Sequence, residues 1–180
     1  MRKSILSILF VLLLTACGSS KDGLTVKDLA IHKSNDDKVV VQYGMSRADA
    51  EKVLGTGEDM KIGHTFTYSD GVKIMYREDK VAGIYLTEES KDVYETAQGM
   101  KIGMSKDDFK KKYGDQYLAD LEKNLDYAYD TDSKQYIKEA EWAKNFEDST
   151  KIYLISMLFD SDGIAQTILL TDRQMAIMYK

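Results

Sequence analysis

The sequence contains no proline and a single cysteine among its 180 residues. Without proline the chain has neither a cis-proline switch nor a polyproline II linker. Because Cys17 is the only cysteine, no intramolecular disulfide can form. The two histidines, His32 and His64, lack the neighbours of zinc and catalytic motifs, and no phosphate-binding or dinucleotide-binding glycine pattern occurs. We therefore expect no enzymatic activity, no metal and no cofactor.

The first 16 residues have the pattern of an export signal. Arg2 and Lys3 precede an apolar run over residues 5–14, which is interrupted only by Ser7. Such a run would span about 15 Å as a helix, roughly half of the hydrocarbon core of a bilayer. It is therefore too short for a permanent transmembrane helix and is typical of a cleaved signal peptide.

The four residues Leu14-Thr15-Ala16-Cys17 resemble the lipobox of bacterial lipoproteins. The resemblance implies that diacylglycerol is attached to the Cys17 thiol and that the signal is cleaved between Ala16 and Cys17. Two or more acyl chains, such as palmitate, hold a protein stably on a bilayer, because each buried CH₂ contributes about 0.8 kcal/mol. We expect a lipid anchor at the extracytoplasmic face of the cell membrane.

The mature chain is predicted to be acidic. Cleavage removes Arg2 and Lys3, so 25 basic residues become 23 against 30 acidic ones, a net charge of about −7. This charge disfavours binding to nucleic acid and electrostatic adhesion to anionic lipids.

An internal repeat is the most informative feature of the remaining sequence. Residues 43–50 recur 59 positions later as residues 102–109, and residues 79–87 resemble residues 162–171 at a displacement of 84. The second copy is therefore longer by 84 − 59, or about 25 residues. Each copy predicts a short helix with a serine N-cap, an aspartate three residues later and a closing glycine, which are Ser46, Asp49 and Gly55, then Ser105, Asp108 and Gly114.

Strands are predicted after each helix. Residues 65–68, 72–77 and 81–87 read as a meander in the first copy, following a strand at 39–43. Alternation points one set toward the helix: Phe66, Tyr68, Val72, Ile74, Tyr76, Ala82, Ile84 and Leu86. It points a second set outward: Thr65, Thr67, Lys73, Met75, Arg77 and Tyr85. The second copy predicts strands at 125–130, 151–159 and 164–171, and an inserted helix at about 133–146.

These patterns predict an α+β fold of two tandem units, each a short helix followed by an antiparallel β-meander. We expect a signal peptide at 1–16, and a lipidated N-terminus, tether and lead-in segment at 17–38. Repeat unit 1 then covers residues 39–97 and repeat unit 2 covers residues 98–180. Whether the two units form one continuous sheet stays open.

A Gly-Met-Ser turn, a helix ending in glycine and a meander together resemble one unit of a known superfamily. It includes the SmpA/OmlA lipoproteins of β-barrel assembly and the β-lactamase inhibitor protein-like fold, which has two such units. The resemblance covers roughly residues 39–172 and rests on residues 44–46 with Gly55 and residues 103–105 with Gly114. The chain departs from the assembly lipoproteins in having two units and no proline after the helix glycine, and from the inhibitor in having no disulfide. The resemblance implies protein binding through exposed sheet and loop surface.

Aromatic and methionine side chains indicate where a partner would bind. Met75 and Tyr85 are expected on an otherwise polar sheet face, and Tyr136 and Trp142 in the inserted helix. Alternatively, Trp142 and Phe146, four residues apart, dock that helix on the core. We expect a non-catalytic module that binds an envelope or extracellular protein.

Two other classes of function remain as alternatives to protein binding. The alternative is a receptor for a small ligand or envelope polymer, with its site in a cleft between the units. A cell-wall hydrolase would need a paired acid motif, and none stands out. The aspartates at 130–133 and 160–163 resemble fragments of calcium loops but lack the required glycine spacing, so we expect solvated turns.

Overall fold

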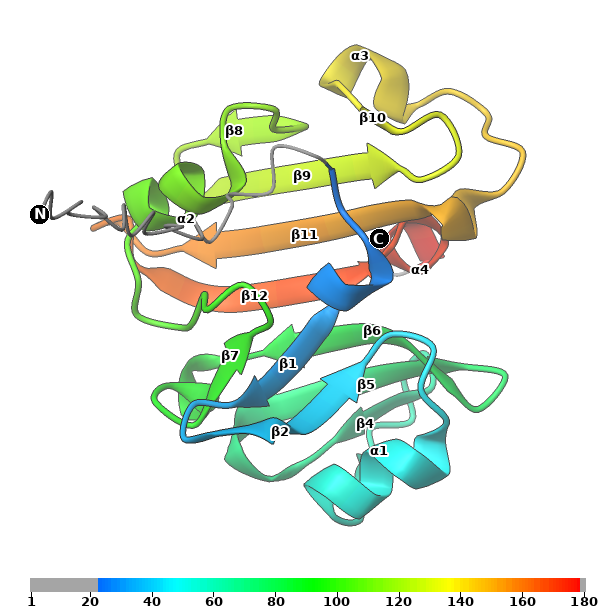
Figure 1. Ribbon diagram of the computed structural model, residues 1–180, viewed down its shortest axis with the longest axis vertical. Helices are drawn as coiled ribbons and strands as arrows, with labels where there is room; N and C mark the ends of the chain where they lie inside the picture. Colours follow the sequence, from blue (N-terminus) through cyan, green and yellow to red (C-terminus); the bar gives the residue numbers. More distant parts are fainter. Residues whose placement is uncertain (1–22, 179–180) are drawn as a thin grey trace, which may run out of the picture.

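The computed structural model describes residues 23–178 (Figure 1). The predicted signal peptide and Cys17 lie outside the described residues. Within residues 23–178, no helix has both the length and the apolar character needed to cross a membrane.

The chain folds into a mixture of helices and antiparallel strands, which confirms the α+β class. The helices are α1 (Arg47–Leu54), α2 (Lys106–Tyr113), α3 (Glu139–Trp142) and α4 (Arg173–Met178), with 3₁₀ turns at Val26–Asp28, Ser69–Gly71, Glu88–Ser90 and Ser149–Lys151. The strands are β1 (Ala30–Lys33), β2 (Asp36–Gln42), β3 (Glu58–Asp59), β4 (Thr65–Thr67), β5 (Val72–Arg77), β6 (Lys80–Leu86), β7 (Tyr94–Thr96), β8 (Ala119–Leu121), β9 (Asn124–Asp130), β10 (Gln135–Tyr136), β11 (Ile152–Phe159) and β12 (Ala165–Asp172).

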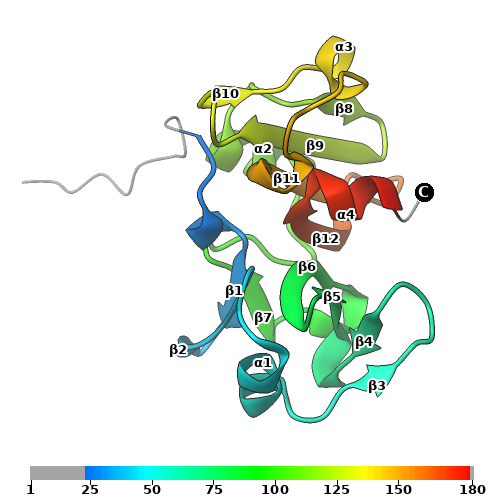
Figure 2. The same cartoon turned by 90° about the vertical axis from the view of Figure 1, so that its right-hand side faces the viewer.

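One large sheet runs through the described part of the chain. Its order is β10-β9-β11-β12-β6-β5-β4-β3, with β8 paired to β9, while β2, β1 and β7 form a small separate sheet. The strands that follow α1 and those that follow α2 meet where β12 pairs with β6, from Ile168 opposite Leu86 to Thr171 opposite Gly83. Figure 2 shows the small sheet and α1 on one side of the large sheet, and α4 on the other.

Both predicted helices begin and end where their caps place them. The Ser46 hydroxyl accepts a hydrogen bond from the Asp49 amide at 3.1 Å, and Ser105 accepts one from Asp108 at 3.3 Å. These bonds satisfy amides that have no partner inside the helix. Gly55 and Gly114 close the helices at φ values of 84° and 83°, a region that disfavours side chains with a Cβ. The helix predictions are confirmed.

The main core lies between the large sheet and the layer formed by α1, α2 and the small sheet. From the large sheet it receives Ile74, Ile84, Leu86, Tyr127, Ile155, Ile168 and Leu170. The small sheet contributes Ile31, Val41 and Tyr94, and α2 contributes Phe109. Residues 24–38, part of the predicted lead-in segment, form a 3₁₀ turn, β1 and the start of β2, and place Leu24, Leu29 and Ile31 in this core.

A β-bulge corrects one of the predicted faces. Between Met75 and Tyr76 the register shifts, so that Tyr76 pairs with Val81. Val81 therefore joins the main core, and Ala82 packs on the opposite face with Met75 and Met175. The prediction that Ala82 faces the helix is wrong, because an extra residue in one strand reverses the alternation beyond it.

The inserted segment is mostly not helical, which corrects the prediction of a helix at about 133–146. Only α3, Glu139–Trp142, is α-helical there, and Gln135–Tyr136 pairs with β9 instead. The Asp130 carboxylate accepts hydrogen bonds from the amides of Asp132 and Ser133, and Lys134 adopts a φ of 56°. The aspartate thus stabilises a turn at the expense of a helix.

The two ends of the described chain lie on opposite faces of the large sheet. Gly23 lies against the Tyr129 ring on the core side, where a Cβ would overlap the ring, and Leu24 is buried in the main core. Helix α4, which the sequence does not predict, packs Met175 against Met75 and Ala82 on the other face. The Asp172 carboxylate caps α4 by accepting a hydrogen bond from the Met175 amide at 2.8 Å.

Candidate functional site: a groove on the open face of the large sheet

The face of the large sheet that points away from the main core carries one row of side chains across five strands. Lys73 pairs with Tyr85, Tyr85 with Leu169, Leu169 with Ser156, and Ser156 with Asp126. Since strands lie about 4.8 Å apart, the row spans roughly 19 Å. It crosses the junction between β6 and β12.

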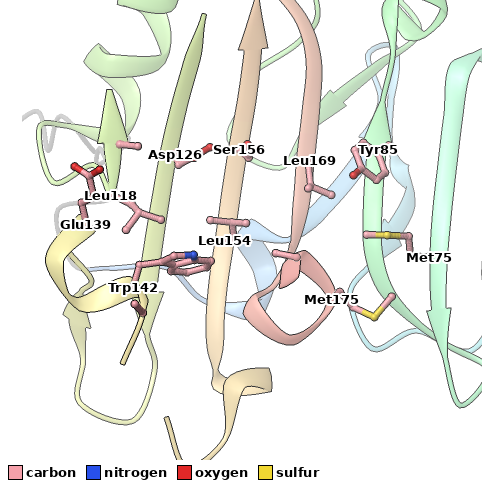
Figure 3. Close-up of a pocket in the computed structure, with 13 residues that line it drawn as sticks. Met75, Tyr85, Leu118, Asp126, Glu139, Trp142, Leu154, Ser156, Leu169 and Met175 are labelled. Carbon is pink, nitrogen blue, oxygen red and sulfur yellow. The ribbon is translucent and has the colours of Figure 1, made fainter. Parts of the chain in front are cut away.

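Two hollows open along this row and share Met75 and Tyr85. We name the first the Trp142 hollow; it has a volume of about 390 Å³. Its apolar lining comes mainly from Leu118, Trp142, Leu154, Leu169 and Met175 (Figure 3). The second, named the Lys73 hollow, measures about 440 Å³ and is lined by Met60, Ile62, Thr65, Lys73, Thr87, Leu158 and Thr167 besides the shared pair. Together the two hollows form one feature, the sheet groove.

Three of the four predicted binding residues meet in the sheet groove. Tyr85 is half-buried and lines both hollows, and Trp142 lines the first. Met75 also lines both, but only 2% of it is exposed, so its predicted exposure is wrong. Met175 of α4 packs against it, and the lack of a side chain at Gly83 leaves room for its methyl group. Tyr136 lies elsewhere, edge-on to Tyr129 and against the main core.

The sequence does not reveal the most exposed apolar residues of the groove. Ile62 is 66% exposed and Leu158 is 50% exposed, and both line the Lys73 hollow together with Met60. Ile62 belongs to a loop rather than to a periodic element, so no hydrophobic pattern marks it. Leu158 lies in a strand that is apolar on both faces, which predicts burial on both sides.

Arg173 fixes the segment that forms one wall of the Trp142 hollow. Its guanidinium donates to the Ser149 hydroxyl and to the Trp142 carbonyl, each at 2.8 Å. The same group lies 5.1 Å from the centre of the Trp142 ring and 4.8 Å from that of Phe146. Both rings also pack on a secondary core cluster around Leu154, so the docking role considered for them holds alongside their place in the groove.

Replacing Arg173 with alanine is expected to loosen this wall. The change removes three hydrogen bonds, the third to the Lys144 carbonyl at 3.3 Å, and both ring contacts, a loss of about 1–3 kcal/mol in the free energy of unfolding. We expect faster proteolysis within residues 131–151 and a red shift of Trp142 fluorescence. Unchanged cleavage rates, measured by limited proteolysis and mass spectrometry, would contradict this role for Arg173.

Asp126, His32 and Asp160 each make a structural contact. The Asp126 carboxylate, at the far end of the row, accepts a hydrogen bond from the Asn124 amide group at 2.7 Å. His32 faces Glu95 on the small sheet, at 3.6 Å, away from the groove. Asp160 accepts bonds from the amides of Asp162 and Ile164, both at 2.9 Å, and so stabilises a turn. Within residues 23–178, no group of three or more potential metal ligands occurs.

The lining of the sheet groove therefore suits the binding of an apolar surface or ligand. Methionine, leucine and aromatic side chains form its floor, and threonine hydroxyls and Lys73 provide polar contacts at one end. Its chemistry has to be inferred from this chain's own residues, because comparisons with protein-family models, with curated proteins and with solved structures give no match.

Proposed function

We propose that this chain is a non-catalytic lipoprotein, anchored outside the cell membrane through Cys17, that binds an apolar segment of another protein in the sheet groove. The observation that carries the proposal is the groove itself, with Ile62 and Leu158 exposed at one end of a continuous apolar floor. Contiguous exposed apolar surface of this kind marks interaction sites more often than scattered single residues do.

We also infer that the two halves are copies of one unit, and matching hydrogen bonds support this. In each half, the turn before the helix is bonded to the last strand. The bonds of the first half run from Gly44 to Val81, from Val81 to Met45 and from Arg47 to Asp79, at 2.7–2.8 Å. Those of the second run from Gly103 to Ala165, from Ala165 to Met104 and from Lys106 to Gly163, at 2.9 Å. Equivalent residues of the two halves are 59 positions apart at the start of the helix and 84 positions apart at the last strand and the turn before it.

The bulges and the central strand pair support the same inference. The register shift at Met75/Tyr76 in one hairpin has its counterpart at Leu158/Phe159 in the other. Tyr85 and Leu169, which occupy equivalent positions 84 residues apart, pair with each other where β6 meets β12. Two equivalent residues can face each other in an antiparallel pair only near an approximate two-fold axis, so the sheet groove lies across that axis.

This position bears on function. The superfamily that the sequence resembles uses exposed sheet and loop surface to bind proteins, and two fused units provide a wider surface than one. In this chain the apolar lining of the sheet groove crosses the junction between the units. We therefore assign partner binding to the sheet groove rather than to either unit alone.

The membrane anchor is tested with a Cys17→Ser variant. Without the thiol no diacylglycerol can be attached, and we expect the protein to move from the membrane fraction to the soluble fraction of lysed cells. Mass spectrometry of the native protein should show a lipid-modified cysteine at its N-terminus. An unmodified N-terminus, or a variant that remains with the membranes, would refute the anchor.

Partner binding is tested by crosslinking the lipid-anchored protein and comparing Ile62→Asp and Tyr85→Ala with wild type. A carboxylate in place of the exposed apolar side chain of Ile62 in the Lys73 hollow, or loss of the central Tyr85 ring, should reduce recovery of the crosslinked partner at least tenfold, as for a binding hot spot. Ile177→Asp is the matched control, because Ile177 is exposed on α4 but does not line the groove. Equal recovery with all three variants would exclude the groove as the binding site.

A second candidate function is a receptor for a small ligand, and the size of the hollows favours it. Volumes of about 390 and 440 Å³ fall within the usual range of small-molecule pockets, roughly 300–1,000 Å³. If this candidate is correct, a ligand should raise the melting temperature of the purified protein without any partner protein present.

A further inference from the structure

The Lys73 hollow places the ammonium group of one lysine among apolar side chains. Lys73 points from β5 to the open face of the sheet and is half-buried. Among residues 23–178, no carboxylate lies within ion-pair distance of its ammonium group. A half-buried charge is usually paired, since its partial loss of water costs free energy.

The neighbours of Lys73 divide into two chemical groups. Thr65, Thr87 and Thr167 surround it with hydroxyl-bearing side chains, while Met60, Ile62 and Leu158 form apolar walls. Past Met75 and Tyr85 the apolar surface continues into the Trp142 hollow. The groove thus has a positively charged end that can donate hydrogen bonds, and a mainly apolar stretch that leads away from it toward the Trp142 hollow, where Asp126 and Glu139 also line the wall.

The loop that holds Ile62 is built around an uncommon backbone. Lys61 and His64 adopt φ values of 59° and 52°, which are strained for residues other than glycine. The loop is held by the Met60 amide, which donates to the Thr65 carbonyl, and by the Thr65 amide, which donates to the Ile62 carbonyl, both at 3.0 Å. This conformation keeps Ile62 at the wall of the hollow with two thirds of its surface exposed.

We propose that the sheet groove binds a single-chain amphiphile with an anionic head group. The head lies at Lys73, where the ammonium group and the hydroxyls of Thr65 and Thr167 donate to it, and the alkyl chain extends past Tyr85 toward Trp142. The Thr87 hydroxyl already donates to the Gly71 carbonyl. The charge of Lys73 selects an anionic head over a neutral or cationic one. This inference rests on the second candidate function, that the groove admits a small ligand, and it is independent of any partner protein.

The experiment uses purified full-length Cys17→Ser protein, which carries no acyl group of its own. Decanoate, decyl phosphate, decanol and decyltrimethylammonium are titrated below their aggregation concentrations, by calorimetry and by fluorescence of Trp142, the only tryptophan. We expect decanoate or decyl phosphate to bind at least tenfold more tightly than the other two, because hydrogen bonds to charged groups are the stronger ones. The ratio between the two anionic probes identifies the head group as carboxylate or phosphate. Chain length gives a second measure, since affinity should rise roughly fourfold for each CH₂ added from octanoate to dodecanoate.

Two lysine variants separate the head-group site from general charge effects. Lys73→Met keeps the aliphatic stem and should reduce affinity for the anionic probes about tenfold or more, with little effect on decanol. Lys61→Met is the control, because Lys61 is highly exposed and already paired with Asp59 at 2.8 Å. Equal affinity for the cationic probe, no effect of Lys73→Met, or no binding of either anionic probe would each overturn the proposal. None of these outcomes would affect the crosslinking test of partner binding.

Discussion

Replacing Asp172 with alanine is expected to lower the free energy of unfolding by about 3–5 kcal/mol, the range for breaking a buried ion pair. The side chain is fully buried and accepts hydrogen bonds from Arg77 at 2.7 Å and from the Tyr43 hydroxyl at 2.6 Å. Burial, followed by this hydrogen bond, raises the pKa of Tyr43, so the hydroxyl remains a donor at neutral pH. Removing the carboxylate leaves the Met175 amide without its acceptor, and leaves the half-buried Arg77 guanidinium with the neutral Tyr43 hydroxyl, at 3.0 Å, in place of a carboxylate.

Urea denaturation of wild type and variants measures this effect. Tyr43→Phe removes one hydroxyl, which donates to Asp172 and accepts from Arg77, and should cost only about 1–2 kcal/mol. Because Asp172 also caps α4, the alanine variant should expose Met75 and change ligand or partner binding at the groove. Tyr43 and Arg77 belong to the first half of the chain and Asp172 to the second. A loss below about 1 kcal/mol for Asp172→Ala would show that these contacts do not stabilise the packing of the two halves.

A second large loss is expected for Phe109→Ala, about 3–5 kcal/mol, as for other fully buried phenylalanines. Phe109 and Tyr113 are the buried residues of α2, and the Phe109 ring, which is fully buried, meets Phe159 edge-on at 5.7 Å. Truncation removes this contact and leaves a cavity in the main core, which the rigid sheet cannot fill by small movements.

The matched control for Phe109→Ala is Lys111→Ala on the same helix. The Lys111 side chain is 78% exposed, and its one ion pair, with Asp108, lies at 3.5 Å on the surface. Its loss should change stability by less than about 0.5 kcal/mol. Thermal unfolding followed by circular dichroism measures both variants, and similar melting temperatures would contradict the assignment of Phe109 to the core.

Local signals in the sequence account for the parts of the fold that are predicted correctly. A serine N-cap and a closing glycine act within a few residues, so the bounds of α1 and α2 can be read directly from the chain. The β5–β6 and β11–β12 hairpins are likewise local, because their turns and alternating residues adjoin. The pairing of the two hairpins, β6 with β12, could not be deduced, since it joins residues 82–88 positions apart.

The errors arise where one residue or a distant contact changes a local pattern. The bulge at Met75/Tyr76 exchanges the faces of Val81 and Ala82, and no composition signal marks it. Met75 faces outward as alternation predicts, yet it is covered by α4 from the far end of the chain. Strand β7 pairs with β1, which lies more than 60 residues earlier in the sequence. Its three residues are too few to show the alternation of apolar and polar side chains that is typical of a strand.

The candidate site is predictable only in part for the same reason. Tyr85 and Trp142 stand out as aromatic residues in polar surroundings, and both line the groove. Ile62 and Lys73 become candidate binding residues only because the hollow they share is lined from five strands, β4, β5, β6, β11 and β12, and a loop. Their arrangement depends on the fold of the whole sheet, so sequence spacing alone does not reveal it.

The position of Gly23 has a consequence for how the molecule would sit at a cell surface. The described chain starts against Tyr129, on the side of the large sheet that faces the small sheet and helices. If the chain is anchored through Cys17 as proposed, the tether ahead of Gly23 would place that side toward the bilayer. The opposite side, where Tyr85 and Lys73 lie, would then face away from the membrane. Large molecules could then reach these residues without having to enter the narrow space above the lipid headgroups.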